Sequence, residues 1–372
     1  MHTSMNNSYI VLNTHILREN VSTILGELPG QTALIPVLKD DAYGLGLTQV
    51  AQVLMEFPEI ETLAISHVSE GAALRRANWK GNILVLGGVM GFLLPLAVEC
   101  DLTLAVGRLG LIPRLADAAR AQGKQVKVQV KIETGLNRIG LLPGEELAAL
   151  IAELRQAADC VTVTGAFSHF ANVSDAQRTQ RQYDSFLAGV AQLENAGIPV
   201  PMRHLCGSAG LELCPQYALD GVRVGRRLYM DHPTQPTGKI KEVASWRTYI
   251  TNIRRLKAGE QLGYGGGCVL TRDTVIATIA VGYGDGLNEA LAACQAPVLV
   301  NGQRARLLCC CMDQSMVDVT GIPCQVDDEV TLFGSDGQGG FLSSQEVSLL
   351  IGENEGCGLI SDLSPRVARI YQ

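Results

Sequence analysis

Several side chains that can take part in covalent or acid–base chemistry lie at the ends of short apolar runs. The set consists of Lys39, Arg138, His169, Ser208 and Arg223, the last accompanied by Gly225. A lysine that is partly desolvated after a buried strand is nucleophilic, and its amine can form an imine with an aldehyde. Taken alone, however, Lys39 could simply mark the point where the chain meets solvent.

Two glycine-containing segments have the composition of phosphate-binding loops. Residues 207–210 read Gly-Ser-Ala-Gly, and Gly225 is followed by Arg226. Small residues, backbone N–H groups and a hydroxyl bind phosphate in loops at the ends of barrel strands. Together with Lys39 and the Asp-Asp-Ala-Tyr-Gly-Leu-Gly sequence that follows it, these segments favour a phosphorylated aldehyde as the cofactor.

The elements that must position these side chains alternate between short apolar runs and longer amphipathic stretches, from about residue 30 to residue 230. This alternation is typical of βα units that build a parallel sheet. Helical patterns include residues 110–122, 145–158 and 176–195. The candidate strands are residues 33–38, 62–65, 83–86, 102–105, 126–132, 162–168, 202–206 and 221–224. Eight such strands predict a (β/α)8 barrel, whose chemistry stands at the carboxyl ends of the strands.

After about residue 240 the pattern changes to alternating strands separated by turn signals. The expected strands are residues 248–256, 274–281, 297–299 and 329–333, with turns at Asn301-Gly302 and residues 334–337. Pro233, Pro236 and Gly238 interrupt the periodicity before this region. We therefore expect a barrel domain at residues 9–236 and a mostly β domain at 237–372, which could also take in residues 1–8.

Composition and charge exclude several classes of partner. The net charge of −7 and the lack of long basic runs argue against nucleic-acid binding. Eleven cysteines in no regular spacing indicate free thiols in a reducing cytoplasm, and six dispersed histidines predict no metal site. The polar residues 1–7 do not resemble a signal peptide, and the uncharged run at 83–98 is short for a membrane span. We expect a cytoplasmic protein with no membrane segment in this chain.

Specific motifs along nearly the whole chain resemble those of the alanine racemases, which are pyridoxal 5'-phosphate (PLP) enzymes of fold type III. The motifs are Lys-Asp-Asp-Ala-Tyr-Gly at 39–44, Lys-Ile-Glu-Thr-Gly-Leu-Asn-Arg-Ile-Gly at 131–140, Ser-His-Phe at 168–170, Val-Arg-Val-Gly at 222–225, Gly-Tyr-Gly at 263–265, Val-Gly-Tyr-Gly-Asp-Gly at 281–286, Cys-Met-Asp-Gln at 311–314 and Ile-Ser-Asp-Leu-Ser-Pro-Arg at 360–366. Their order along the chain is the same as in the family. The resemblance implies an amino-acid racemase.

The resemblance implies two bases on opposite faces of the substrate. Lys39 would carry PLP as a Schiff base and serve as the base on one face of the substrate Cα, while Tyr264 would act on the other face. In the family this tyrosine comes from the β domain of a second subunit, so the resemblance implies a homodimer with composite active sites. Racemisation needs both bases, because one removes the proton and the other returns it.

The resemblance also implies residues that hold the cofactor. Arg223 would face the pyridine nitrogen; because a guanidinium can only donate, that nitrogen would stay unprotonated. His204 would support this arginine, and His169 would lie beside the cofactor ring. The phosphate group would be bound by Tyr43, Ser208 and the backbone amides of Gly225 and Arg226.

Further residues are implied for the amino-acid substrate. Arg138 would bind the substrate carboxylate and tune Tyr264, and Lys131 stands where many relatives carry a carbamylated lysine that bonds this arginine. The backbone N–H of Met312 would bind the carboxylate too, with Asp313 nearby. Tyr283 would gate the entrance.

Three positions depart from the family pattern. We place Asp362 where the family usually has a tyrosine, and the smaller polar side chain leaves room for the hydroxymethyl group of serine. We expect Arg226 to pair with Asp362, because an ionised carboxylate near phosphate needs a counter-ion. Asn137 replaces a glycine and Gly207 an asparagine, so the pocket could admit larger substrates.

Alanine and serine are therefore the expected substrates, and four alternatives stay open. A racemase of larger or basic amino acids would use Asp362 to bind a cationic side chain. A fold-type III decarboxylase would lack the Gly-Tyr-Gly and Cys-Met-Asp-Gln motifs that this chain contains. A non-catalytic PLP-binding protein would end near the barrel. The chain could also be the catalytic part of a membrane-anchored racemase.

Overall fold

The computed structural model describes residues 6–232, 234–266, 268–353 and 357–372, so the boundary residue Pro233 lies outside the described residues. The chain divides into two compact units. We call Val21–Ala42 with Leu47–Leu228 the barrel unit. The remainder, namely the chain up to Asn20, Tyr43–Gly46 and Tyr229–Gln372, is the β unit.

The barrel unit contains the eight predicted strands. They are β2 (Ala33–Pro36), β3 (Thr62–Ile65), β4 (Asn82–Val85), β5 (Thr103–Val106), β6 (Val126–Lys131), β7 (Val161–Phe167), β8 (Arg203–His204) and β9 (Gly221–Val224). Strands β3 to β8 form one parallel sheet in chain order, and β2 pairs with β9. A bridge between Val37 and Ala64 joins β2 to β3, and the Arg223 N–H donates to the Cys206 carbonyl between β9 and β8. The predicted (β/α)8 barrel is confirmed.

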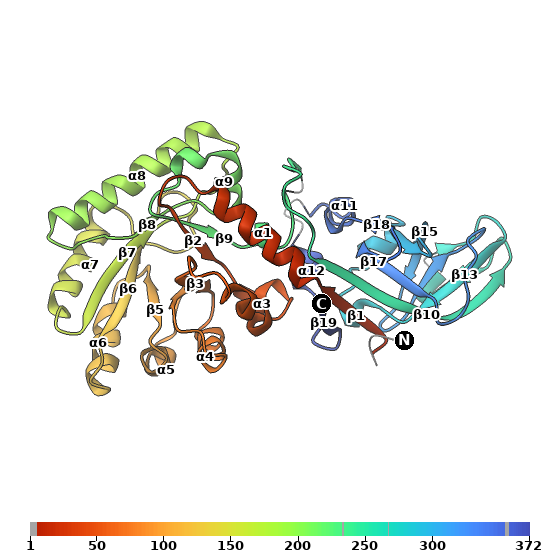
Figure 1. Ribbon diagram of the computed structural model, residues 1–372, viewed down its shortest axis with the longest axis horizontal. Coiled ribbons are helices and arrows are strands. Elements are labelled where there is room, and N and C mark those ends of the chain that lie inside the picture. The colour runs from red at the N-terminus through yellow and green to blue at the C-terminus, as the bar shows by residue number, and fades with distance from the viewer. Residues whose placement is uncertain (1–5, 233, 267, 354–356) are drawn as a thin grey trace. The chain divides into compact units, whose positions relative to one another are not determined.

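Helices cover the outside of these strands because each has one apolar face (Figure 1). Three of them, α6 (Leu111–Ala121), α7 (Glu145–Gln156) and α8 (Ala176–Asn195), were predicted from periodicity. Asp175 caps α8 by accepting the N–H of Arg178 at 3.0 Å. The other helices of the chain are α1 (Thr14–Glu27), α2 (Lys39–Tyr43), α3 (Leu47–Leu54), α4 (Val68–Arg76), α5 (Leu94–Glu99), α9 (Ser208–Leu213), α10 (Ala290–Ala293), α11 (Ser344–Leu350) and α12 (Gly358–Ser361).

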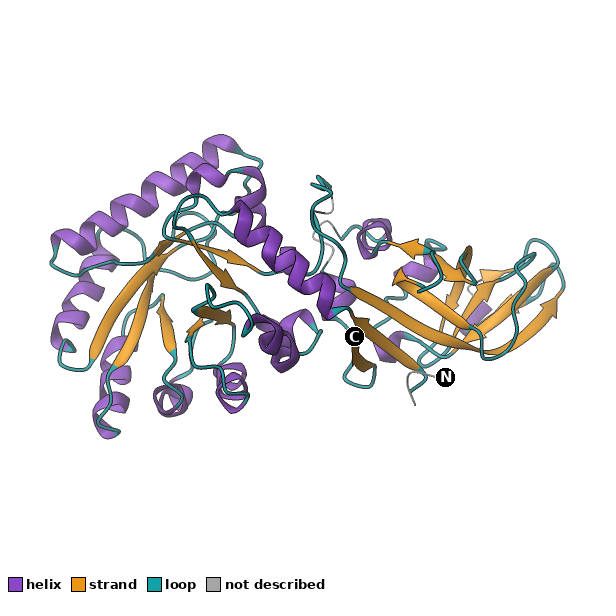
Figure 2. Ribbon diagram, viewed as in Figure 1, coloured by secondary structure: helices purple, strands orange, loops and turns teal. Residues whose placement is uncertain are grey.

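The β unit is built mainly from strands (Figure 2). They are β1 (Ser8–Leu12), β10 (Ala244–Leu256), β11 (Gln261–Leu262), β12 (Cys268–Val269), β13 (Thr274–Ile279), β14 (Pro297–Val300), β15 (Gln303–Cys310), β16 (Ser315–Asp318), β17 (Glu329–Ser335), β18 (Phe341–Leu342) and β19 (Ala368–Tyr371). Six of them close into a ring in the order β17-β14-β15-β16-β13-β10, because β17 also pairs with β10. Strand β1 pairs with β10 and β19, so residues 9–12 lie in this sheet although we expected them in the barrel domain.

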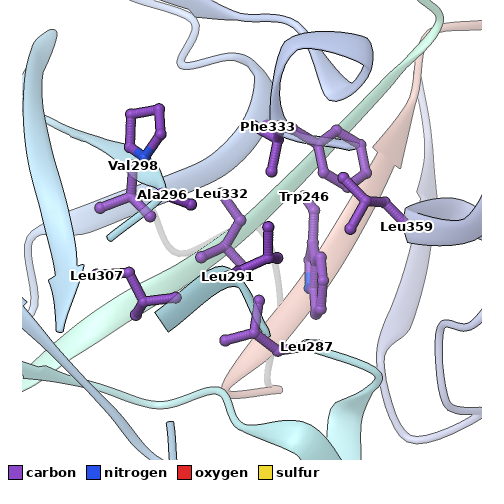
Figure 3. A pocket seen from close by; sticks show the side chains of 11 residues that line it. Trp246, Leu287, Leu291, Ala296, Val298, Leu307, Leu332, Phe333 and Leu359 are labelled. Carbon is purple, nitrogen blue, oxygen red and sulfur yellow. The ribbon is translucent and has the colours of Figure 1, made fainter. Parts of the chain in front are cut away.

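Turn chemistry and apolar packing shape the β unit. The predicted Asn301-Gly302 turn joins β14 to β15, and both residues have the positive φ (49° and 76°) that a two-residue hairpin requires. Trp246, which is fully buried, packs edge-on against Phe333. A small cavity beside them is lined almost wholly by apolar side chains, and it has room for about one water-sized molecule (Figure 3).

Within the described ranges, no helix is both long enough and apolar enough to cross a membrane. The same part of the chain contains no group of three or more histidine, cysteine or acidic side chains that could hold a metal ion.

Candidate active site

Lys39 is half-buried at the carboxyl end of β2 and begins an unusual turn. The next four residues, from Asp40 to Tyr43, all have φ between 55° and 60°. Left-handed backbone costs a residue other than glycine about 1–2 kcal/mol. The turn is held by Asp41, whose Oδ1 accepts the Leu47 N–H at 2.8 Å. Strain of this kind gathers at functional sites, where the surrounding structure fixes it.

Arg223 is the most constrained side chain of the site. Its guanidinium group is buried and makes five hydrogen bonds. Nη1 donates to Nδ1 (2.7 Å) and to the carbonyl (3.0 Å) of His204. Nη2 donates to the carbonyls of Ser168 (2.7 Å) and Leu205 (3.0 Å) and to Nδ1 of His169 (3.0 Å). Within the described ranges, Nε–H is the donor of this group that has no protein partner.

These contacts fix the protonation of both histidines. Since Nδ1 of His204 and Nδ1 of His169 accept from Arg223, each ring carries its proton on Nε2. His204 then donates from Nε2 to Oε1 of Gln129 at 2.6 Å. Burial, followed by the charge of Arg223, lowers the pKa of both histidines well below the ordinary value, so both are neutral at pH 7.

Lys131 ends β6 inside the barrel and is 3% exposed. Its Nζ lies 4.8 Å from the centre of the Phe167 ring. Burial lowers its pKa well below the usual value, and the charges of Arg223 and Arg138 add to this effect. The amine of Lys131 therefore loses its proton more easily than that of an exposed lysine. It lies close enough to Arg223 and Arg138 for their positive charges to contribute to this effect.

The segment that carries Arg138 explains one departure from the family pattern. Asn137 has φ 59°, in the left-handed region that asparagine tolerates better than most residues. Asparagine therefore tolerates the backbone conformation that this position has here. Arg138 itself is exposed at the carboxyl end of β6.

The predicted phosphate loops lie side by side at the ends of β8 and β9. Ser208 Oγ accepts the N–H of Gly225 at 3.2 Å and the N–H of Arg227 at 3.4 Å. Its own hydroxyl hydrogen is not used in either of these bonds. A Cβ atom at Gly207 would lie 3.1 Å from Cε1 of His169, so the imidazole ring packs closely against the space that a side chain at this position would need.

Arg226 has a partner that the sequence did not indicate. Its Nη2 lies 2.5 Å from Oε2 of Glu212, and both side chains are buried. Asp362 belongs to the other unit, and its expected pairing with Arg226 stays a prediction. Glu212 and Gln129 are the polar residues that sequence reasoning missed. The only local signal for Glu212 was its spacing of four residues from Ser208.

The β unit contains the remaining predicted residues. Tyr264 lies in the turn η4 (Tyr264–Gly266) and its side chain is 86% exposed. Gly263 before it has φ 68°, and a Cβ there would meet Sγ of Cys309 at 2.2 Å. Tyr43 lies in a segment of the same unit, where its ring is 5.5 Å from that of Tyr229.

The segments around Tyr283, Met312 and Asp362 contact one another within the β unit. The Tyr283 N–H donates to the Cys311 carbonyl at 3.0 Å, and Gly284 donates to Met312 at 2.8 Å. Met312 and Asp313 are exposed. Asp362 is exposed at the end of α12, and its carbonyl oxygen would lie 2.3 Å from a Cβ at Gly286. The structure therefore gathers Tyr283, Met312, Asp313 and the Asp362 backbone at one place.

A (β/α)8 barrel with a lysine after its first strand and an additional, largely β unit defines a class of two-domain barrel enzymes. Models of the alanine racemase N-terminal and C-terminal domains match residues 12–233 and 243–371. The chain belongs to the alanine racemase family, as its motifs predicted.

Individual alanine racemases are similar in sequence or structure to this chain over almost its whole length. An alanine racemase of Desulforamulus reducens is 32% identical over 368 residues, which is 97% of either chain. One of Methanococcus maripaludis is 30% identical over 363 residues, 95% of this chain and 96% of the relative. Among solved structures, the alanine racemase of a D-cycloserine-producing Streptomyces lavendulae has a TM-score of 0.92 at 27% identity, covering 99% of this chain and 98% of that one. That of Bacillus anthracis with bound L-Ala-P has a TM-score of 0.89 at 26% identity, covering 99% and 96%.

Proposed function

We propose that this chain is a PLP-dependent racemase that interconverts L- and D-alanine. The observation that carries the reaction type is the match to both alanine racemase domain models, which together span most of the chain. Relatives of nearly equal length are named alanine racemases. The PLP cofactor rests on a different observation, namely the hydrogen-bond donors and acceptors of the barrel unit.

The donor pattern around Arg223 fits a pyridine ring. Four of its five N–H groups are engaged by neutral acceptors, and Nε–H is left to meet a ring nitrogen that offers a lone pair. Ser208 offers a hydroxyl hydrogen for a phosphate oxygen, as part of the proposed set with Tyr43, Gly225 and Arg226. Because the Gly225 N–H already donates to Ser208, we expect the Ser208 hydroxyl, rather than this N–H, to bind the phosphate group.

The proposed chemistry divides between the cofactor and the side chains. When bound, PLP supplies an electron-withdrawing ring that makes the α-proton of an attached amino acid acidic. Lys39 would hold the cofactor through Nζ and then take or return the proton on one face. Tyr264 would do the same on the opposite face, and Arg138 with the Met312 N–H would hold the substrate carboxylate. Asp313, Tyr283 and Lys131 complete the proposed substrate site.

A homodimer is part of the proposal because both units expose apolar side chains near the proposed site residues. Tyr264 and Met312 are exposed in the β unit. In the barrel unit, Met90, Phe92 and Leu142 are exposed after β4 and β6, at the carboxyl ends of the strands. A contiguous patch of such side chains would mark an association surface, and these residues are the proposed contributors to it. A Tyr264 supplied by a second subunit would complete each site.

Serine is a second candidate substrate because Asp362 is polar and exposed. A carboxylate at this position could accept a hydrogen bond from a hydroxymethyl group. Replacing Asp362 by tyrosine should then shift the preference from serine towards alanine. An unchanged ratio of the two rates would show that Asp362 does not contact the substrate side chain.

The free thiols of all eleven cysteines suit a reducing compartment such as the cytoplasm.

The test is exchange of the α-proton in D₂O and loss of optical activity, for L-alanine, L-serine and L-lysine with added PLP. We expect both signals with L-alanine, and their loss in Lys39→Ala. Full activity of that variant would refute the mechanism, and release of CO₂ without inversion would indicate a decarboxylase. Faster turnover of L-lysine than of L-alanine would indicate a racemase of basic amino acids.

A further inference from the structure

Four charged side chains, three of them buried, form a network beside the predicted phosphate loops. Glu212 of α9 contacts two consecutive arginines of the turn η3 (Arg226–Leu228): its Oε2 lies 2.5 Å from Nη2 of Arg226, and its Oε1 lies 3.2 Å from Nε of Arg227. Arg227 continues to Glu27 of α1, with Nη2 2.5 Å from Oε2. The side chains of Glu212, Arg226 and Arg227 are all at least 94% buried.

The network has a fixed relation to Ser208. Ser208 and Glu212 are four residues apart on α9, so they lie on the same face of the helix. Ser208 accepts two backbone N–H groups from the turn at 225–227, while Glu212 binds two side chains of the same turn. Two side chains of one helix face thus hold the turn through three hydrogen bonds and one ion pair that lacks hydrogen-bond geometry.

We propose that Glu212 is a positioning residue for the phosphate group of the cofactor, because it fixes the helix that carries Ser208 against the turn that carries Gly225 and Arg226. This inference rests on the proposed PLP function. Glu212 does not contact the ligand in this proposal; it acts through Ser208. With both lone pairs of the Ser208 hydroxyl taken by N–H groups, its hydrogen has one direction left, and that direction depends on the register of helix and turn.

Charge explains why a carboxylate is suited to this place. Two adjacent buried guanidinium groups repel each other and are costly without a partner. Glu212 and Glu27 supply two negative charges to the two positive ones, so the charges of these four side chains cancel. Both arginine side chains are thereby held by protein carboxylates. In the proposal, the side-chain donors for the phosphate group are therefore the hydroxyl groups of Ser208 and Tyr43, and not the two guanidinium groups.

The test is a double variant, Glu212→Met with Arg226→Met, which removes one negative and one positive charge and leaves the Arg227–Glu27 pair. Replacing a buried pair by apolar side chains of similar size is often tolerated by the fold. Binding of PLP and of pyridoxal, which lacks the phosphate, is followed by the visible absorbance of the bound ring. We expect PLP affinity to fall about tenfold, the effect of about one hydrogen bond, while pyridoxal affinity changes less than about twofold.

The control is the same exchange at a second pair, Arg203→Met with Asp220→Met. These residues pair at 2.7 Å at the amino ends of β8 and β9, away from the predicted site. The control should leave the ratio of PLP to pyridoxal affinity unchanged. If the double variant does not fold, Arg226→Met alone, which still removes one contact of Glu212, should lower the ratio in the same direction.

The outcomes separate this inference from the proposed function. An unchanged affinity ratio in a folded Glu212 variant, or in Arg226→Met, would overturn the positioning role. An equal fall for PLP and pyridoxal would overturn it too, because a general loosening of the barrel does not depend on phosphate. If the wild-type protein bound neither ligand, the proposed function itself would fail, and this inference with it.

Discussion

Replacing Glu242 by glutamine should stabilise the β unit at pH 8 far more than at pH 5. Glu242 precedes β10, and its carboxylate accepts the Ser344 N–H at the start of α11, at 3.1 and 3.2 Å. Burial raises the pKa of Glu242 from 4.5 to about 7, although hydrogen bonds from Ser344 and Ser343 partly oppose this shift. Glutamine keeps an acceptor oxygen and has no proton to lose.

The sign of the effect follows from the raised pKa. Between about pH 4.5 and pH 7, the folded protein keeps a proton that the unfolded chain has lost, so stability falls as the pH rises through this window. The difference between the pKa of 4.5 in the unfolded chain and about 7 in the folded protein destabilises the folded wild type by about 3 kcal/mol at pH 8 and by about 1 kcal/mol at pH 5. From pH 5 to pH 8, the free energy of unfolding of the variant should therefore rise by about 2 to 3 kcal/mol relative to that of the wild type.

Urea unfolding at several pH values measures this gain. Trp79 and Trp246 are the two tryptophans, so a Trp79→Phe background leaves Trp246, in the core of the β unit, as the fluorescent reporter. Glu346→Gln is the matched control on α11, because Arg304 lowers the pKa of Glu346 by a hydrogen bond. That control should lose stability at pH 8. The reasoning is refuted if the Glu242 variant and the wild type differ by the same amount at pH 5 and pH 8.

Three further predictions concern the proposed active site. Arg223→Lys leaves at most three donors for the acceptors that Arg223 binds. It should lower the free energy of unfolding of the apoprotein by about 2–4 kcal/mol. An unchanged midpoint in urea titrations would contradict this. Lys131, whose pKa is lowered by burial, should react with CO₂ to give a carbamate and a proton, seen as a ¹³C signal from labelled bicarbonate that Lys131→Ala lacks; identical spectra would exclude the carbamate. Gly263→Ala should slow racemisation about tenfold, because its Cβ would meet Sγ of Cys309. Adding Cys309→Ala should restore part of that rate, and no recovery would assign the loss to the φ of 68° alone.

The barrel could be predicted from the sequence because its signal is repeated. Most of the strands are short, largely apolar and largely buried, and eight such segments separated by amphipathic helices admit few other folds. The Asn301-Gly302 turn was predictable for a similar reason, since both residues tolerate positive φ. These features depend on local composition, which a single sequence displays directly.

The missed features depend on contacts between distant segments. Nothing in the sequence near Arg226 indicates that its partner is Glu212, fourteen residues earlier on a short helix. The left-handed turn from Asp40 to Tyr43 was also missed, because aspartate, alanine and tyrosine give no strong signal for positive φ in succession. The tertiary structure imposes that conformation, and sequence propensity does not reveal it.

The electrostatics of the barrel unit support a racemase more specifically than the fold does. Burial lowers the pKa of Arg223 to about 10, so the group stays charged at neutral pH and can only donate. The acceptors that hold it are carbonyl oxygens and neutral imidazoles, and a carboxylate in this place could instead have shared a proton with a ring nitrogen. Because an unprotonated ring withdraws electrons less strongly, negative charge would stay nearer the substrate Cα, where a proton must return. A site built this way would favour reprotonation at Cα by the two proposed bases, Lys39 and Tyr264, over reactions that need a stronger electron sink.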